Sequence, residues 1–512
     1  MEARYQLDDF LVSLHCNCNI ETKMENKVRT RFAPSPTGYM HIGNLRTALF
    51  AYLYTKSKCG DFILRIEDTD QGRFVEGATD IIYSTLKTAK LAHDEGPDIG
   101  GKYGPYTQSE RKSIYRKYAE ELVANGQAYY CFCDKNEKSD DNNEGYDRHC
   151  RDLPLSIVEE YLNEKRPYVI RQKIPLNGTT SWDDMVYGTI TVENSTLDDQ
   201  VLLKSDGMPT YNFANVVDDH LMNITHIIRG SEYLSSNPKY LLLYKAFGWE
   251  TPKYIHLPLI NGKNPDGTVS KLSKRHGAVS FQALVDDGYL PEAIVNYIAL
   301  LGWSPKTTQE IFSMEELIKE FSVSGIHKNP AVFDYLKLDW VNSQHIAKME
   351  LDDFAKLSLD YASIQGTDLE KKWHKVASLL QCRINKFSEI SDKIKFLKKL
   401  DKYDVNLYVN KKNKSTYESA YNILKASINS LSSVQDWSED ELKMNLTELA
   451  ENLGVKIGQL YWPIRIAISG LLVTPGGATD ILYILGKSTS IDRLNIGLEL
   501  IDASMRHTFS CE

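Results

Sequence analysis

The segment APSPTGYMHIGN at residues 33–44 combines prolines, glycines and one histidine between a predicted strand and a predicted helix. Backbone N–H groups and the dipole at a helix N-terminus favour a bound anion. Gly38 and Gly43 let the backbone approach a ligand closely, and His41 offers a donor to phosphate oxygens whose charge changes during a reaction. The loop predicts a phosphate site, although an isolated histidine here is more often an ordinary helix-start residue.

A second segment, KLSKR at residues 271–275, follows a glycine-containing stretch at 261–267. Its ammonium groups suit it to closing over a triphosphate and neutralising the negative charge that develops there. A single pentamer of this kind is more often a solvated basic turn. The joint occurrence of both segments favours nucleotide chemistry over two separate structural explanations.

Soft sulfur ligands occur close together in the sequence at Cys131, Cys133 and Cys150. Thiolates in such a group bind tetrahedral zinc, and the alternative is three reduced cysteines without a metal. The residues available as a fourth ligand are Tyr146, His149 and Asp152.

A lysine-rich stretch at residues 386–414 is interleaved with Phe396, Tyr403 and Tyr408. Lysines suit contacts with RNA phosphates, and aromatic rings suit stacking on unpaired bases. A solvated helix face explains the same lysines equally well, so both interpretations stay open.

The elements that position the first loop follow from its flanking sequence. Residues 28–33 are predicted to form a strand, and residues 61–66 form a nearly continuous apolar strand of the kind that is covered on both faces. Between them a helix is predicted, with an apolar stripe at Leu45, Ala48, Leu49 and Tyr52. This order predicts a βαβ nucleotide-binding unit.

Strand-like segments resume at residues 225–228 and 254–260, and amphipathic helices dominate from about residue 284 onward. The predicted fold class is therefore α/β, with a doubly wound Rossmann-type catalytic domain, an α/β insertion, and an all-α C-terminal region. The domains are predicted at these residues: an extension at 1–23, the catalytic domain at 24–95 and 206–264, the insertion at 96–205, a stem-contact region at 265–345 and a helical domain at 346–512.

The net charge of −9 over 512 residues excludes a uniformly cationic surface, so any RNA contact must be a local patch. Eight scattered cysteines are too few for a small disulfide-stapled domain and indicate a reducing compartment, which favours a cytoplasmic protein. The first 23 residues hold no apolar run long enough for a signal peptide or a membrane span. We therefore expect no membrane association.

HIGN at residues 41–44 and KLSKR at 271–275 resemble the two signature motifs of class I aminoacyl-tRNA synthetases, in the same order and with a similarly wide separation. The longer segment RFAPSPTGYMHIGNLRTALF at 31–50 resembles the glutamyl-tRNA synthetases of bacterial type rather than the glutaminyl enzymes. Further segments with this resemblance are LRIEDTD at 64–70, YNFANVVDDH at 211–220, ITHIIRGSEY at 224–233 and WVNSQHI at 340–346. The resemblance covers essentially everything after Met24, and residues 453–487 resemble the helical anticodon-binding region.

The resemblance implies a set of site residues. His41 and Lys274 are expected to be catalytic. The residues expected to bind ATP are Pro34, Ser35, Pro36, Thr37, Gly38, His41, Gly43, Asn44, Lys271, Ser273, Lys274 and Arg275. The residues expected to bind glutamate are Arg31, Ala33, Ser35, Glu67, Tyr211, Asn215 and Arg229. Arginine suits a substrate with two carboxylates, and one acid suits its ammonium group.

The same resemblance implies that ATP with Mg²⁺ is used, that L-glutamate and tRNA(Glu) are partners, and that the protein is a monomer which needs tRNA for efficient activation of glutamate. Some members of the family bind zinc and carry a histidine two positions after the last cysteine. This sequence has Asp152 there, so the predicted ligand set is Cys131, Cys133, Cys150 and Asp152, with the fourth ligand left open.

Three alternatives to a tRNA(Glu)-specific ligase remain. A non-discriminating enzyme that also charges tRNA(Gln) would have the same catalytic motifs. A non-catalytic RNA-binding homologue would not need intact HIGN and KLSKR motifs, and a nucleotidyltransferase with a small acceptor would not need the long helical C-terminal region. Charging of purified tRNAs separates these functions.

Overall fold

The structure is a computed structural model that describes residues 27–70, 72, 75–133, 146–264, 266–273 and 280–509. The described chain divides into two compact units, one containing residues 27–286 and 291–341, the other containing 287–290 and 342–509. The predicted extension at residues 1–23 lies outside the described residues. The longer segment of the second unit begins at residue 342.

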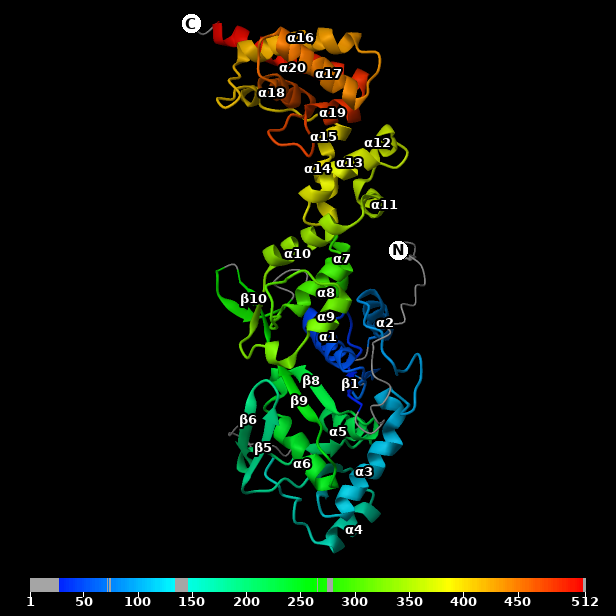
Figure 1. Ribbon diagram of the computed structural model, residues 1–512. Coiled ribbons are helices and arrows are strands. Elements are labelled where there is room, and N and C mark those ends of the chain that lie inside the picture. The colour runs from blue at the N-terminus through cyan, green and yellow to red at the C-terminus, as the bar shows by residue number, and fades with distance from the viewer. Residues whose placement is uncertain are drawn as a thin grey trace. The chain divides into compact units, whose positions relative to one another are not determined.

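The first unit contains both helices and strands, in the order that the sequence predicts around the histidine loop (Figure 1). Its strands are β1 (Arg29–Phe32), β2 (Asp61–Leu64), β3 (Ala128–Cys131), β4 (Val169–Gln172), β5 (Thr179–Asp184), β6 (Gly188–Glu193), β7 (Val201–Leu203), β8 (His226–Gly230), β9 (Lys253–Leu257), β10 (Ile260–Lys263), β11 (Val269–Lys271) and β12 (Ala331–Phe333). Its helices are α1 (Ile42–Ser57), α2 (Ala78–Thr88), α3 (Lys112–Ala124), α4 (Leu155–Asn163), α5 (Tyr211–Leu221), α6 (Asn237–Phe247), α7 (Phe281–Asp286), α8 (Pro291–Ala299), α9 (Met314–Glu320) and the start of α10 (Tyr335–Lys348).

β1 lies between β2, its sheet partner, and the start of β8. β1 pairs in parallel with β2, and the Thr225 amide donates to the Arg29 carbonyl at 2.9 Å, which sets β1 beside the start of β8. β8 pairs in parallel with β9, and β9 pairs in parallel with β5, which forms an antiparallel hairpin with β6. β1 and β2 form a two-stranded sheet, and β8, β9, β5 and β6 follow one another in a four-stranded sheet. Figure 1 shows β8 and β9 next to each other, and β1 packs beside β8.

This sheet includes strands from the predicted insertion at residues 96–205. β5 and β6 both fall within that range, yet β5 pairs with β9 through Asp184 and Tyr254. Strand pairing between distant segments is decided by tertiary packing, which local patterning does not encode. The insertion therefore contributes an edge to the catalytic sheet in addition to its own β3–β4–β7 sheet.

α1 packs on the sheet through the apolar stripe that the sequence predicts. Leu45, Ala48 and Leu49 are completely buried, and Tyr52 is nearly so. α1 lies against β1, β2 and β8 on its sheet side. The helix thus has a fixed position, and its N-terminus is held at the carboxyl end of β1, where ligands bind in open parallel sheets.

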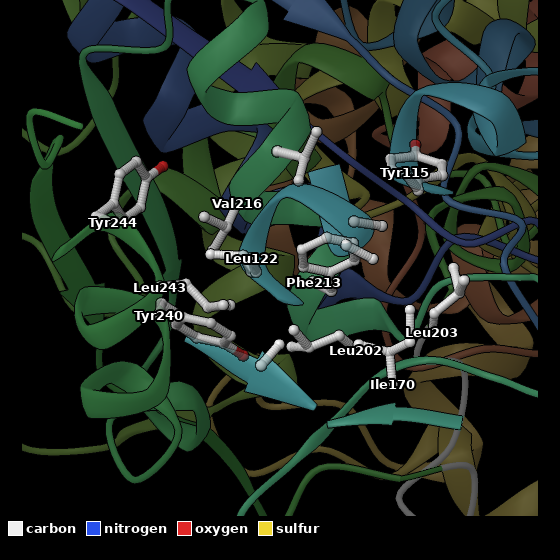
Figure 2. Close-up of a cluster of buried hydrophobic side chains, with 14 residues drawn as sticks. Tyr115, Leu122, Ile170, Leu202, Leu203, Phe213, Val216, Tyr240, Leu243 and Tyr244 are labelled. Carbon is white, nitrogen blue, oxygen red and sulfur yellow. The ribbon is translucent and has the colours of Figure 1, made fainter. Parts of the chain in front are cut away.

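A second core joins the insertion to the segment that follows it (Figure 2). Tyr115 and Leu122 from α3 face Phe213 and Val216 from α5. Further side chains of this core are Ile170 from β4, Leu202 and Leu203 from β7, and Tyr240, Leu243 and Tyr244 from α6. This packing fixes α5 and α6, which both carry candidate site residues or their neighbours.

The second unit consists of helices in the residues that the structure describes. Its helices are the end of α10, α11 (Leu351–Ala362), α12 (Asp368–Lys371), α13 (Trp373–Leu380), α14 (Ile390–Lys393), α15 (Lys395–Lys398), α16 (Tyr417–Ser433), α17 (Glu439–Asn452), α18 (Ile457–Ser469), α19 (Ala478–Leu485) and α20 (Lys487–Phe509). α16, α17, α18 and α20 pack together (Figure 1). A Cβ on Gly497 of α20 would lie 2.4 Å from the Tyr408 hydroxyl and 2.9 Å from Ala467 Cβ, so this close helix contact requires glycine.

Candidate active site

His41 caps the N-terminus of α1. Its Nδ1 accepts from the Gly43 amide at 3.0 Å, so a neutral ring carries its proton on Nε2. Burial and the nearby Lys271 charge both lower the pKa of His41, which favours this neutral form. Gly38 has φ of +121°, a backbone conformation that side chains rarely tolerate. The loop thus presents a neutral N–H donor beside a helix N-terminus.

The structure brings the two separated motifs together. The backbone of His41 forms an antiparallel bridge with Ser280, and Lys271 is close enough for its charge to affect the His41 ring. Lys271 is exposed at the end of β11, and Ser273 is half-buried. The predictions for Lys274 and Arg275 lie outside the described residues.

The rest of the predicted ATP set lines the same loop. Ser35, Thr37 and Asn44 are exposed, whereas Pro34 and Pro36 are buried. Glu67 N donates to the Pro34 carbonyl at 3.0 Å, which ties the loop to the segment that follows β2. The loop therefore connects directly to an acid from the predicted glutamate set.

A buried ion-pair network holds Arg31 and Glu67. Arg31 Nε donates to Asp219 Oδ1 at 3.0 Å, and Arg65 Nη1 donates to the same oxygen at 2.7 Å. Arg65 Nη2 also donates to Glu67 Oε1 at 2.9 Å. Burial opposes the ionised form of Asp219, but the attraction of Arg31 and Arg65 and their hydrogen bonds lower its pKa on balance. Asp219 and Arg65 thus hold Arg31 on β1 and Glu67 after β2 in fixed positions relative to each other.

Arg229, on β8, is a second buried arginine at this site. Its Nε donates to His256 Nε2 at 3.2 Å and its Nη2 donates to Asn237 Oδ1. Nη1 is buried without a hydrogen-bond partner in the part of the chain that the structure describes. An unpaired buried N–H costs free energy, so this nitrogen is a candidate contact for a polar ligand.

Tyr211 and Asn215 lie one helical turn apart on α5. Asn215 Nδ2 donates to the Tyr211 carbonyl at 2.9 Å, and the Tyr211 ring packs 5.7 Å from that of Tyr233. Burial raises the pKa of the Tyr211 phenol, with a contribution from the Glu67 charge, while the Arg229 charge opposes the rise. Tyr211 is therefore near both Glu67 and Arg229.

Several predicted glutamate residues lie near one another, although they come from four segments. Arg31 is connected to Glu67 through Asp219 and Arg65. The Arg229 guanidinium carbon and the Tyr211 ring lie 5.4 Å and 5.7 Å from the centre of the Tyr233 ring, and β8, which carries Arg229, begins beside β1, which carries Arg31. Two guanidinium groups and one acid suit a small molecule with two carboxylates and one ammonium group. Ala33 is half-buried and Ser35 exposed at the end of β1, beside Arg31.

Several residues that hold this site were not identified as functional from the sequence. They are Arg65, Asp184, Asp219 and His256, all of which are buried. The signal that could have found them is charge inside apolar segments, since Asp219 ends the run ANVVDD in α5 and Arg65 follows the apolar strand β2. Buried charges are rare unless they are paired.

The three cysteine sulfurs form a cluster in which all lie within 4.8 Å of one another. Cys133 Sγ is 3.4 Å from Cys150 Sγ, and the Cys131 thiol donates to the Tyr146 hydroxyl at 3.3 Å. Zinc at about 2.3 Å from each sulfur in a tetrahedron separates the sulfurs by about 3.8 Å. The arrangement of the three sulfurs fits zinc.

Asp152 is not among the groups that the structure brings to these sulfurs. Its carboxylate pairs with Lys173 Nζ at 2.8 Å, and its side chain is 78% exposed. The Tyr146 hydroxyl, in contrast, accepts from the Cys150 amide at 3.1 Å as well as from Cys131. The phenol is therefore the better placed of the three candidates for a fourth ligand, and His149 is exposed.

The lysine-rich stretch has exposed lysines, but two of its aromatic residues are internal. Phe396 and Tyr408 are buried, and Tyr408 shares a 2.8 Å hydrogen bond with Tyr403. The prediction that these two rings stack on RNA bases is wrong, because both are buried in the protein core, where apolar surface is removed from water. The exposed lysines, including Lys399, Lys402, Lys411 and Lys412, remain candidates for phosphate contacts.

The helices that the structure describes include none with the length and apolar character needed to cross a membrane.

The chain matches two family models. Residues 27–340 match the catalytic domain of class I tRNA synthetases (E and Q), and residues 353–498 match an anticodon-binding domain. The chain is 52% identical over 480 residues to a glutamate–tRNA ligase of Clostridium novyi, covering 92% of this chain and 98% of that protein. It is 53% identical over 490 residues to a glutamate–tRNA ligase of Clostridium botulinum strain Hall, covering 94% of this chain and 100% of that protein.

A solved structure is similar over nearly the whole chain. The glutamate tRNA ligase of Elizabethkingia meningosepticum, solved in complex with its amino acid, has a TM-score of 0.83 and 36% identity, covering 93% of this chain and 100% of that one. The resemblance found in the motifs is confirmed, as is the Rossmann-type catalytic domain followed by a helical anticodon-binding region. The buried arginines, the histidine loop and these matches lead to one conclusion: the chain belongs to the class I glutamyl-tRNA synthetase family.

Proposed function

We propose that this chain activates glutamate with ATP and transfers it to the 3′ end of tRNA(Glu), releasing AMP and pyrophosphate. Family membership supports this activity. The observation that carries it is the pair of buried arginines on neighbouring strands, Arg31 on β1 and Arg229 on β8, beside the loop that ends at the helix cap His41. Asp219 and Arg65 connect Arg31 to the buried acid Glu67. These charges next to an anion-binding helix N-terminus support the binding of an acidic amino acid beside a triphosphate.

In the proposed pocket, Arg31 and Arg229 bind the substrate carboxylates. Arg31 uses Nε for Asp219, so its terminal nitrogens carry further N–H donors for a ligand. Glu67 accepts from the substrate ammonium group, and Tyr211 and Asn215 add polar contacts on α5. Ala33 and Ser35 complete the pocket at the end of β1. Glutamine carries no negative charge on its side chain, so it would gain less from the two arginines.

In the first proposed step, ATP enters as its magnesium complex and lies on the loop at residues 34–44. A glutamate α-carboxylate oxygen bonds to the α-phosphorus, the bond from that phosphorus to the bridging oxygen breaks, and pyrophosphate leaves. The His41 Nε2–H donates to phosphate oxygen as charge develops. Lys271, Ser273, Lys274 and Arg275 act on the same triphosphate in this proposal, with Lys274 as the second catalytic group.

In the second proposed step, a terminal ribose hydroxyl of the tRNA attacks the activated carbonyl. The ester bond forms, the bond to phosphate breaks, and AMP leaves. This step depends mainly on holding the two substrates in line. The match of residues 353–498 to an anticodon-binding domain supports tRNA recognition by the helical region.

We also propose that Cys131, Cys133 and Cys150 hold a structural zinc ion with the Tyr146 phenol as the fourth ligand. The sulfur geometry and the contacts of the phenol support this assignment. When bound, zinc would cross-link β3 to the segment around Cys150. We also propose that the protein is cytoplasmic, since ATP, glutamate and tRNA meet in that compartment. We propose a monomer because the family resemblance implies one.

A pyrophosphate-exchange assay with a panel of amino acids tests the proposed activity. The assay uses ATP, labelled pyrophosphate, and either no tRNA or purified tRNA(Glu). We expect exchange with glutamate, much less with glutamine or aspartate, and stronger exchange when tRNA(Glu) is present. Exchange that depends on another amino acid, or none with glutamate under either condition, contradicts the proposal.

A further inference from the structure

Arg229, His256 and Asp184 form a hydrogen-bonded chain of buried side chains from three neighbouring strands. Arg229 on β8 is the register partner of His256 on β9, and its Nε donates to His256 Nε2 at 3.2 Å. On the other side of the ring, His256 Nδ1 lies 2.6 Å from Asp184 Oδ2 on β5. The side chains of His256 and Asp184 are completely buried.

Only one protonation state of His256 satisfies both neighbours. The arginine side chain can only donate, so Nε2 must accept and carry no proton. A neutral imidazole then has its proton on Nδ1, where it donates to the Asp184 carboxylate. Burial lowers the pKa of His256 and outweighs the opposing effect of its hydrogen bond to Asp184, which agrees with a neutral ring.

Asp184 is itself fixed in place by backbone donors. Its Oδ1 accepts from Val186 N and Tyr187 N, each at 2.9 Å, and its Oδ2 accepts from His256 N at 3.2 Å. The carboxylate therefore cannot rotate without losing backbone hydrogen bonds. Its orientation determines which imidazole nitrogen is protonated.

The remaining contacts of Arg229 leave one nitrogen for a ligand. Nη2 donates to Asn237 Oδ1, and the guanidinium carbon lies 4.5 Å from the centre of the Tyr240 ring. Tyr233 and Tyr254 place their ring centres 5.4 Å from the same carbon. Nη1 is the buried nitrogen that has no protein partner among the described residues. The surrounding groups thus define the direction in which Nη1 points.

We propose that Asp184 is a positioning residue for glutamate recognition, which acts by fixing the His256 tautomer and thereby the Arg229 guanidinium that binds a substrate carboxylate. This inference rests on the proposed function of Arg229. The Asp184 side chain is completely buried, and it belongs to the β5–β6 hairpin, whose pairing with β9 brings it to His256.

Asp184→Asn tests the relay with almost no change in volume. The asparagine oxygen keeps the bonds from Val186 and Tyr187, while its amide nitrogen faces His256 Nδ1. The His256 proton then moves to Nε2 and opposes the Arg229 Nε–H. We expect the KM for glutamate to rise about ten- to a hundredfold, as for loss of a charge-assisted hydrogen bond, while the KM for ATP changes by less than about twofold.

Asp199→Asn is the matched control. Asp199 is another fully buried carboxylate of the insertion, and it accepts from Tyr129, Arg151 and the Ile174 amide. Its loss is expected to lower the thermal stability and leave the KM for glutamate unchanged. The assay for every variant is pyrophosphate exchange on the full chain with tRNA(Glu) present, together with a thermal melt.

Two further comparisons test whether the effect passes through His256 and Arg229. A glutamine at position 256 can accept from Arg229 and donate to Asp184, so His256→Gln should raise the KM for glutamate less than His256→Leu. In an Arg229→Lys background, Asp184→Asn should add little further change, because the group that it orients is already gone.

A folded Asp184→Asn variant with an unchanged KM for glutamate overturns the inference, and so do equal rises in the KM for glutamate and for ATP. If Asp184→Asn does not fold, the two His256 variants decide, and equal KM values for them overturn it. If the wild-type chain activates no glutamate, the proposed function is refuted, and the inference with it. If the wild type is active and Asp184→Asn leaves the KM for glutamate unchanged, only the inference is refuted.

Discussion

Arg65 Nη1 and Asp219 Oδ1 meet at 2.7 Å, and both side chains are completely closed to solvent. Asp219 also accepts from Arg31, and Arg65 also donates to Glu67. One buried ion pair therefore links two opposite charges, Arg31 and Glu67, of the proposed glutamate site. These hydrogen bonds hold both side chains in place without a ligand, which reduces the cost of ordering them on binding.

Removal of Asp219 should destabilise the first unit. Asp219→Ala leaves Arg31 and Arg65 buried without their shared partner, and breaking a buried pair in this way costs about 3–5 kcal/mol. A thermal melt of the full chain should show its earliest transition at a lower temperature. Asp152→Ala, which removes an exposed partner of Lys173, should leave that melt unchanged.

The Asp219 effect should also depend on pH. The folded protein lowers the pKa of Asp219, so the stability it contributes is present above the unfolded pKa of about 3.9 and is lost as the pH falls through the lower folded value. The difference in melting temperature between the wild type and Asp219→Asn should therefore be constant near neutral pH and shrink below about pH 4. A difference that grows on acidification would contradict this reading.

Arg31→Lys should weaken glutamate recognition despite the retained charge. Lysine has no Nε to donate to Asp219 while its terminal nitrogen reaches the substrate. The KM for glutamate should rise about tenfold or more, with the KM for ATP little changed. Arg151→Lys, whose parent arginine is half-buried and pairs with Asp199, is the control for an ion-paired arginine outside the proposed site. Equal effects of both variants on the KM for glutamate would contradict the role of Arg31.

Lys274→Ala should slow adenylate formation about 100- to 1,000-fold, since the ammonium group stabilises charge that develops on the triphosphate. Its affinity for tRNA should stay close to that of the wild type. Single-turnover adenylate formation and a filter-binding titration measure the two quantities separately. Lys263→Ala, which removes an exposed lysine of β10, is the control. Lost tRNA binding with normal activation would contradict the assignment.

Zinc should copurify with the chain at about one ion per molecule, as expected for one closed tetrahedral site. Cys133→Ser should lower this content and the melting temperature, because sulfur ligands to a structural ion contribute to folding. Cys382→Ser, at an exposed cysteine of the other unit, should change neither. Elemental analysis of protein purified with excess zinc measures this content. An unchanged zinc content in Cys133→Ser would contradict the assignment of the three cysteines as zinc ligands. Tyr146→Phe tests the fourth ligand in the same way.

The family was predictable from the sequence, because HIGN at residues 41–44 and KLSKR at 271–275 carry its motifs. The α1 stripe from Leu45 to Tyr52 was also predictable, since helical periodicity reports burial directly. Asp184 and His256 were not predictable, because their meeting depends on the pairing of β5 with β9 across the insertion. Phe396 and Tyr408 were misread for a related reason, since a lysine-rich sequence does not reveal which aromatic rings turn inward.

Aminoacylation with labelled glutamate measures the complete proposed reaction, from free amino acid to charged tRNA. Purified tRNA(Glu) and tRNA(Gln) are supplied in separate reactions with ATP, and acid-precipitable label is measured over time. We expect rapid charging of tRNA(Glu), and the reaction with tRNA(Gln) separates a discriminating from a non-discriminating enzyme. Charging of both tRNAs would establish a non-discriminating ligase, and charging of neither, with the protein folded and tRNA bound, would contradict the assignment of this chain as a glutamate–tRNA ligase.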